Sequence, residues 1–138
     1  MAKPRKTTLL TNLEVSVMCV IWDASPRPLT VREVVDELNR DRKKPLAYNT
    51  VQTILTILKD KGVARSRPGA GRAHEFSARL SREEVSSSMV GDLVDRLFDG
   101  QAHALLLKLV EHESLSRAEL LDLKQLIEHE LEDEPEEP

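Results

Sequence analysis

A chain of 138 residues forms one domain, or a small domain with an appendage, so we expect a modest core and no large catalytic cleft. Its single cysteine, Cys19, excludes an intramolecular disulfide, and the surrounding apolar run VSVMCVIW is typical of a buried thiol in a reducing compartment. No segment reaches about 18 consecutive apolar residues, and the N-terminus lacks the apolar stretch of a secretory signal. We therefore expect a cytoplasmic protein with no membrane span.

The net charge of −4 averages two halves of opposite sign. Residues 1–80 contain 15 Lys and Arg against 8 Asp and Glu, a net charge of +7, whereas residues 81–138 contain 5 against 16, a net charge of −11. A basic segment attracts phosphates and an acidic one is repelled by them. The two halves are expected to bind different partners, although at any one position a Lys or Arg that only maintains solubility is the simpler alternative.

Two helices are predicted before residue 41. The first begins after Thr11, which has Glu14 in the capping-box relation, and ends at SPRP. A short extended LT precedes the second helix, which runs from about Val31 to Arg40 with Thr30 and Glu33 in the same relation. The inward residues are Leu13, Val17, Met18, Ile21 and Trp22 in the first helix and Val34, Val35 and Leu38 in the second.

A third helix is predicted over LAYNTVQTILTILKDKG, residues 46–62, after a basic linker broken by Pro45. Its apolar residues recur at helical intervals, and Gly62 is the residue type expected just after a helix. Residues 63–80 predict a β-hairpin with a turn at PGAG, inward anchors at Val63, Phe76 and Leu80, and arginines at 65, 67, 72 and 79. Three helices followed by a basic hairpin is the order of a winged helix-turn-helix, in which the hairpin is the wing.

Residues 81–132 predict only helices. One begins with Ser81 and Glu84 in the capping-box relation and ends at Gly100, a second runs from about Gln101 to His112, and a third follows Ser116. Their apolar surface exceeds what three short helices bury alone, so we expect a homodimer. The expected interface consists of Leu105, Leu106, Leu109, Val110, Leu120, Leu123 and Ile127, with Leu126 and Leu131 also apolar.

The predicted fold class is therefore mainly α with a small β-hairpin wing: a winged helix-turn-helix domain at 7–80 and a helical dimerisation domain at 81–132. The acidic, proline-containing segment at 133–138 is expected to be a disordered tail.

The third helix turns uncharged polar residues away from its apolar side, where solvated helices usually carry Glu and Lys. Amide and hydroxyl side chains suit base edges in the major groove of double-stranded DNA. The predicted base-reading residues are Tyr48, Asn49, Thr50, Gln52, Thr53 and Thr56. The alternative interpretation is that Thr50 caps the helix and that the glutamine and threonines are neutral surface residues.

Cations flank this helix on both sides and are predicted to hold the DNA backbone, which positions a protein without specifying sequence. They are Lys3, Arg5, Lys6, Arg40, Arg42, Lys43, Lys44, Arg65, Arg67 and Arg72. Neutralising about six phosphates per dimer predicts an affinity that falls with nearly the sixth power of salt concentration. A merely solvated charged face predicts weak binding that ignores sequence.

Four segments resemble the penicillinase repressor family of the BlaI/MecI type: LTNLEVSVMCVIW, LTVREVVDEL, YNTVQTILTILKDKGV and DRLFDGQAHALLLKLVEHESLSRAELLDLKQLI. The similarity extends from Leu10 to Ile127, and NTVQTILTIL and LSRAELLDLKQLI are its most specific parts. The resemblance implies a homodimeric winged-helix repressor that binds inverted repeats in promoters of β-lactam resistance genes. It also implies release through a membrane-bound sensor pathway that leads to cleavage in the dimerisation region.

The chain departs from the family pattern at two places. The family is cut between Asn and Phe, and the corresponding candidate cleavage site here is Lys108–Leu109, so the protease and the role of cleavage stay open. Ile57 stands where an Arg is frequent late in the recognition helix. Related copper-responsive repressors carry a cysteine-rich metal site, which one cysteine cannot form, and His103, His112 and His129 have no paired spacing for zinc. We expect no metal and no cofactor.

Three other functions are alternatives to DNA reading. An enzyme is not expected, because Ser86, Ser87 and Ser88 match no nucleophile motif and no carboxylates are paired in a pocket. A ligand-sensing winged-helix repressor with a different regulon needs an apolar pocket between the two lobes, which an aromatic content of 3% disfavours. A winged helix that contacts a protein partner instead of DNA is the third alternative.

Overall fold

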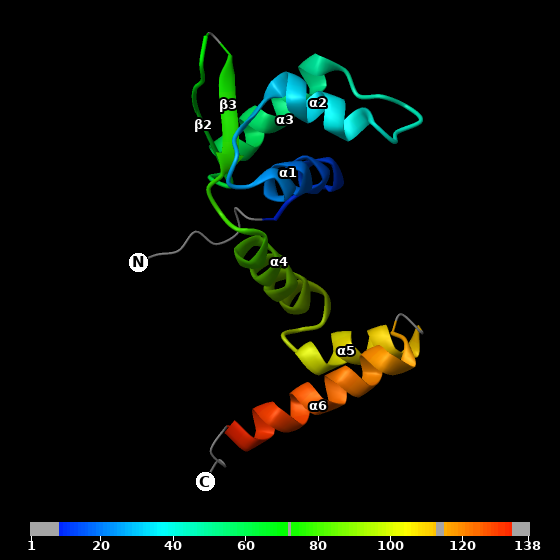
Figure 1. Ribbon diagram of the computed structural model, residues 1–138. Helices are drawn as coiled ribbons and strands as arrows, with labels where there is room; N and C mark the ends of the chain where they lie inside the picture. The colour runs from blue at the N-terminus through cyan, green and yellow to red at the C-terminus, as the bar shows by residue number, and fades with distance from the viewer. Residues whose placement is uncertain (1–8, 72, 113–114, 134–138) are drawn as a thin grey trace. The chain divides into compact units, whose positions relative to one another are not determined.

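The computed structural model describes residues 9–71, 73–112 and 115–133. Its elements, in chain order (Figure 1), are α1 (Asn12–Ala24), β1 (Leu29–Thr30), α2 (Val31–Asn39), α3 (Tyr48–Asp60), β2 (Ala64–Pro68), β3 (His74–Ala78), α4 (Arg82–Leu97), α5 (Ala102–Glu111) and α6 (Arg117–Asp133). The chain divides into two compact units, with the division between Leu93 and Val94. The mainly helical class with a small β wing is confirmed.

Reciprocal side-chain caps start the helices where the sequence predicts them. At the start of α1, Thr11 N donates to Glu14 Oε1 at 2.9 Å and Glu14 N donates to Thr11 Oγ1 at 3.2 Å. Thr30 and Glu33 make the same pair of bonds at α2. Such boxes satisfy backbone N–H groups that the first helical turn leaves without partners. The same arrangement is present between Ser81 and Glu84 and between Ser116 and Glu119.

The end of α3 is set by a glycine in the left-handed region. Gly62 has φ of 82°, its N–H donates to Lys59 O at 3.0 Å, and Val63 N donates to Leu58 O at 3.0 Å. This is the Schellman arrangement, which a residue with a Cβ adopts only with strain. It confirms the predicted stop and turns the chain directly into the wing.

The predicted hairpin belongs to a three-stranded antiparallel sheet in the order β1-β3-β2. Arg67 lies opposite Glu75 in the β2–β3 pair, and Ser66 lies opposite Phe76. The short LT segment that the sequence marks only as extended is β1, because Leu29 pairs with Phe76 across the other edge of β3. The wing is thereby tied to the chain just before α2.

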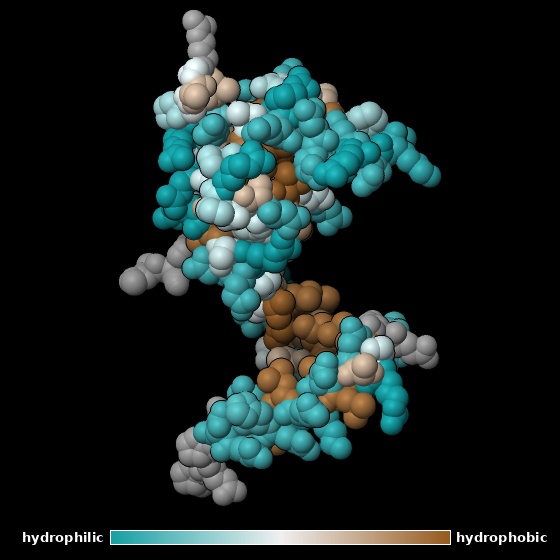
Figure 2. Space-filling model, in the orientation of Figure 1, coloured by the Kyte–Doolittle hydropathy of each residue, from teal (hydrophilic) through white to brown (hydrophobic). Residues whose placement is uncertain are grey.

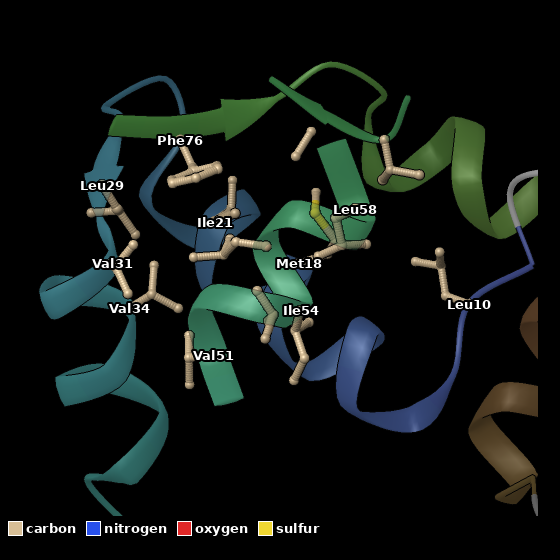
Figure 3. Packing of buried hydrophobic residues seen from close by; sticks show 14 of the residues in the cluster. Leu10, Met18, Ile21, Leu29, Val31, Val34, Val51, Ile54, Leu58 and Phe76 are labelled. Carbon is tan, nitrogen blue, oxygen red and sulfur yellow. The ribbon is translucent and has the colours of Figure 1, made fainter. Parts of the chain in front are cut away.

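The core of the first unit lies between α1, α2, α3 and the sheet (Figure 3). The deepest side chains are Val17, Met18, Ile21, Val34, Val51, Leu55, Leu58 and Val63. Two expectations for α1 are wrong: Leu13 is exposed, and the Cys19 thiol is only half-buried. Both fall off the buried stripe, since Glu14, Val17, Met18 and Ile21 occupy the inward positions at helical spacing.

The first unit extends past the boundary predicted at residue 80. Val85, in the second turn of α4, is 2% exposed, and Met89 packs against the same core. The functional division of the chain at residues 80 and 81 stays a prediction. The predicted acidic tail lies outside the described residues apart from Asp133, which ends α6.

Candidate nucleic-acid interface

The polar residues of α3 lie together on its open side. Its apolar residues Val51, Ile54, Leu55 and Leu58 are buried, so the helix is anchored along one face. The six predicted base-reading residues, Tyr48, Asn49, Thr50, Gln52, Thr53 and Thr56, are all exposed. Thr50 lies inside the first turn and Ala47 is the N-cap residue, without a side-chain cap, so a capping role for Thr50 is wrong.

A groove of about 480 Å³ runs between α3 and the sheet, and it divides these six residues into two sets. Tyr48, Gln52 and Thr56 line the groove together with Ser66 and His74 of the wing. The other three, Asn49, Thr50 and Thr53, are not part of its lining and face open solvent. A duplex against α3 would therefore meet wing side chains on one flank of the helix only.

Arg32, Lys59 and His74 also line the groove, and the sequence pattern does not single them out. The Arg32 guanidinium carbon lies 5.0 Å from the centre of the Tyr48 ring, a cation–π contact between the starts of α2 and α3. Arg32 also approaches Asp36 at 3.7 Å. The spacing of apolar residues along α2 predicts that Arg32 points outward, but it does not predict that Arg32 contacts Tyr48 at the start of α3.

Two backbone hydrogen bonds from one side chain fix the approach to α3. Asn39 Nδ2 donates to Leu46 O at 3.0 Å, and Leu46 N donates to Asn39 Oδ1 at 2.8 Å. The amide therefore ties the end of α2 to the residue two positions before α3 and closes the basic linker into a loop. Asn39 is a positioning residue that the apolar periodicity does not reveal.

The far end of α3 is held by an ion pair to α1. Lys61 Nζ lies 2.7 Å from Glu14 Oε1 and donates to Leu9 O at 3.1 Å. Burial raises the pKa of the Glu14 carboxyl, but the hydrogen bonds from Lys61 and Thr11 together outweigh burial and hold that pKa below its usual range. Glu14 is thus a charged residue in the core, at 5% exposure, compensated by one ammonium group.

The predicted backbone-binding cations occupy different surroundings. Arg65 and Arg67 are exposed at alternate positions of β2, so they project from the same side of the wing. Lys43 and Lys44 are exposed in the linker, where Arg42 Nε donates to Lys44 O at 3.2 Å. Lys3, Arg5, Lys6 and Arg72 lie outside the described residues.

Arg40 differs from the other cations because it is paired within its own segment. Its guanidinium forms an ion pair with Glu37, one turn earlier. This hydrogen bond raises the pKa of Arg40 and lowers the pKa of Glu37. A phosphate would have to compete with Glu37, so Arg40 is a weaker candidate than Arg67. Arg79, the fourth arginine of the predicted hairpin, is exposed just after β3, and its Nη1 donates to Gly62 O at 3.1 Å.

In the second unit, α5 and α6 contain no buried residue. Figure 2 shows apolar side chains gathered over the C-terminal helices. Of the predicted interface, Leu106, Leu109, Val110, Leu120 and Ile127 are 36–45% exposed, and Leu105 and Leu123 are half-buried. Leu107 and Leu121 are more exposed still, and the sequence gives no signal to separate them from their neighbours.

The candidate cleavage site lies inside a regular helix. Lys108 and Leu109 are exposed in α5, and Lys108 O accepts from His112 N at 3.1 Å and contacts His112 Nδ1 at 2.9 Å. A protease binds its substrate as extended backbone, so the last turns of α5 would have to open locally before a cut.

The described part of the chain lacks two features that would indicate other functions. No helix there is both long and apolar enough to cross a membrane. No group of three or more His, Cys, Asp or Glu side chains there is placed to hold a metal ion.

A three-helix core whose third helix presents a polar face beside a β wing defines a winged-helix DNA-binding protein. The family described as "Penicillinase repressor" matches residues 10–129, and this chain belongs to that family. It is therefore a transcriptional repressor of the winged-helix class and not an enzyme, as the sequence predicts.

Two proteins of similar sequence support the same assignment. The chain is 26% identical to the penicillinase repressor of Bacillus licheniformis over 124 residues, 90% of this chain and 93% of that protein. It is 21% identical to the methicillin resistance regulatory protein MecI of Staphylococcus aureus (strain N315) over 122 residues, 88% and 95% of the two chains. The solved hsRosR-S4 complex shares the fold, with a TM-score of 0.50 at 15% identity over 81% of this chain and 96% of that one.

Proposed function

We propose that the protein is a cytoplasmic homodimer that represses β-lactam resistance genes by binding inverted-repeat operators with α3. The observation that carries the proposal is the exposed row of uncharged polar residues on α3, which is anchored on its other side and lies beside Ser66 and His74 of the wing. Amides and hydroxyls distinguish base edges, whereas arginines on the wing contact phosphates of any sequence. The names of the two relatives support the proposed regulon.

Dimerisation supplies the affinity. The exposed leucines of α5 and α6 are apolar surface that a second copy would cover. Two recognition helices held about 34–36 Å apart, or a multiple of that distance, meet two half-sites on the same side of the duplex. Each half-site then raises the effective concentration of the other. Cleavage at Lys108–Leu109 by a sensor-linked protease would remove this gain without altering α3.

The assignment of roles is tested by exchanging one side chain of each kind. Gln52→Ala is expected to weaken binding by about 1–3 kcal/mol at one base position and to relax the preference there. Arg67→Ala is expected to weaken all duplexes alike and to reduce the salt slope by about one. Gln125→Ala, at an exposed position of α6, and Arg27→Ala, at an exposed position that does not line the groove beside α3, are the matched controls.

Operators selected from randomised duplexes provide the DNA for this measurement, and titration at several salt concentrations gives the slope. Equal losses on every duplex for Gln52→Ala and Arg67→Ala would refute the division of roles. Scrambled duplexes that compete as well as the selected ones would favour the protein-contact module instead. Footprinting of the genome then tests whether β-lactam resistance promoters are occupied.

A further inference from the structure

The start of α4 is tied to α1 by contacts that the proposed DNA reading does not use. Trp22 Nε1 donates to Leu80 O at 3.0 Å, just before α4 begins. The Arg82 guanidinium carbon lies 5.2 Å from the centre of the Trp22 ring, and Arg82 Nη2 lies 2.9 Å from Asp23 Oδ1. Arg82 Nη1 also donates to Cys19 Sγ at 3.8 Å, so four contacts on Cys19, Trp22 and Asp23 of α1 hold the entry to α4.

The first turns of α4 also pack on the N-terminal core. Ser81 and Glu84 cap the helix reciprocally, and Val85 is buried at 2% exposure. From this anchored end α4 is one continuous helix to Leu97, and the division between the two units falls within it, after Leu93. The direction in which the chain leaves the first unit is thus set by the contacts at residues 80–85.

We propose that Arg82 is a positioning residue that fixes the direction of α4 and thereby sets the half-site spacing that the dimer accepts. The inference rests on the proposed function, binding of a homodimer to an inverted repeat. One additional base pair moves a half-site by about 3.4 Å and turns it by about 35° around the duplex. A dimer with a fixed α4 meets this misfit as strain, whereas a dimer with a loose α4 absorbs it by tilting.

The solvent exposure of the Arg82–Asp23 ion pair indicates that it orients α4 and contributes little to folding stability. The side chains of Arg82 and Asp23 are 54% and 76% exposed, and ion pairs so open to solvent contribute little to folding free energy. The geometry is nevertheless specific, because the guanidinium meets both an aromatic face and a carboxylate. Removing it leaves the buried Val85 in place, so the variant is expected to fold.

The test compares operators that differ only in the spacing of their half-sites. Inverted repeats are first selected from randomised duplexes with the wild-type protein, and versions one base pair shorter and longer are then titrated. Wild type is expected to lose about tenfold in affinity per base pair, since the duplex must be deformed to fit. For Arg82→Ala the loss is expected to fall below threefold, with affinity for an isolated half-site and the dimer mass unchanged.

Arg27→Ala is the matched control, because Arg27 is likewise an exposed arginine in an ion pair, with Glu33 at 3.5 Å. It is expected to keep the wild-type spacing penalty. An unchanged penalty in Arg82→Ala would overturn the inference. So would an equal loss on all spacings and on the isolated half-site, since that pattern indicates a DNA contact or a folding defect.

A second measurement needs no DNA. Spin labels at Thr53→Cys in α3 and Ser87→Cys in α4 report the distance between these helices in protein diluted with unlabelled chains. The background for both the reference and Arg82→Ala is Cys19→Ser, whose hydroxyl keeps an acceptor for Arg82 in place of the Cys19 thiol. The distribution is expected to be narrow and to broaden in Arg82→Ala; a distribution that stays narrow contradicts a positioning role. If the wild type selects no inverted repeat, the proposed function fails as well. If it selects one and Arg82→Ala keeps both its spacing penalty and its narrow distribution, only this inference fails.

Discussion

The ion pair between Glu14 and Lys61 provides the most direct test of how α3 is held. Lys61→Met removes the ammonium group and keeps most of the aliphatic stem. Of the two groups that donate to Glu14 Oε1, the Thr11 N–H and the Lys61 ammonium, only the Thr11 N–H then remains. Loss of one partner from a fully buried pair costs about 3–5 kcal/mol. Because the Lys61 side chain is 29% exposed against 7% for Glu14, solvent screens part of the loss, and we expect about 2 kcal/mol at pH 7.

The pH dependence of this loss has a defined sign. The pKa of Glu14 in the folded protein lies below its ordinary value of 4.5. The ion pair therefore stabilises the fold above pH 4.5 and loses that contribution as the pH falls below 4.5 through the folded pKa. In Lys61→Met, only the hydrogen bonds with Thr11 still oppose the effect of burial on the pKa of Glu14, so the carboxyl binds a proton more readily. The difference in stability between wild type and Lys61→Met is expected to shrink on going from pH 7 to pH 4.

The assay is denaturant unfolding followed by the fluorescence of Trp22, the only tryptophan in the chain. Protein concentration is held constant, because the stability of a dimer depends on it. Lys59→Met is the matched control, since Lys59 is exposed two residues earlier on α3. A loss for Lys61→Met no larger than for Lys59→Met at pH 7, or one that is the same at pH 4, would refute the reasoning. Glu14→Gln, which keeps an acceptor for Thr11, completes a double-mutant cycle.

Three further outcomes are expected. Leu109→Glu places a charge on the exposed apolar face of α5, so the protein should sediment as a monomer while it still binds an isolated half-site. A variant that remains dimeric would show that this face is not the interface. Phe76→Ala should cost about 3–4 kcal/mol in the same unfolding assay, because the ring is 7% exposed and belongs to the core beside its cross-strand partner Leu29; a cost below 1 kcal/mol contradicts that packing. Asn39→Ala should lower operator affinity without altering base preference, because Leu46 loses both of its bonds; a changed preference would argue that Asn39 acts on the bases.

The helices and their faces could be predicted because they depend on neighbours in the sequence. The bonds between Thr11 and Glu14 join residues three apart, and the Schellman turn at Gly62 closes within one helical turn. The polar face of α3 follows from the spacing of its apolar residues alone. The same spacing gave Leu13 an inward position that the structure does not, since periodicity marks the width of an apolar stripe only approximately.

The sequence alone thus determines which residues α3 exposes on its polar face, because a helical period assigns each side chain to a face. What holds α3 in place depends on contacts between residues far apart: Lys61 and Glu14 are 47 positions apart, and Trp22 and Leu80 are 58 apart. A local pattern shows that a side chain points outward or inward but not which element it meets. That choice is made when the helices pack, and it is the reason that the groove beside Tyr48, the pairing of β1 with β3 and the anchored start of α4 emerge only in the folded protein.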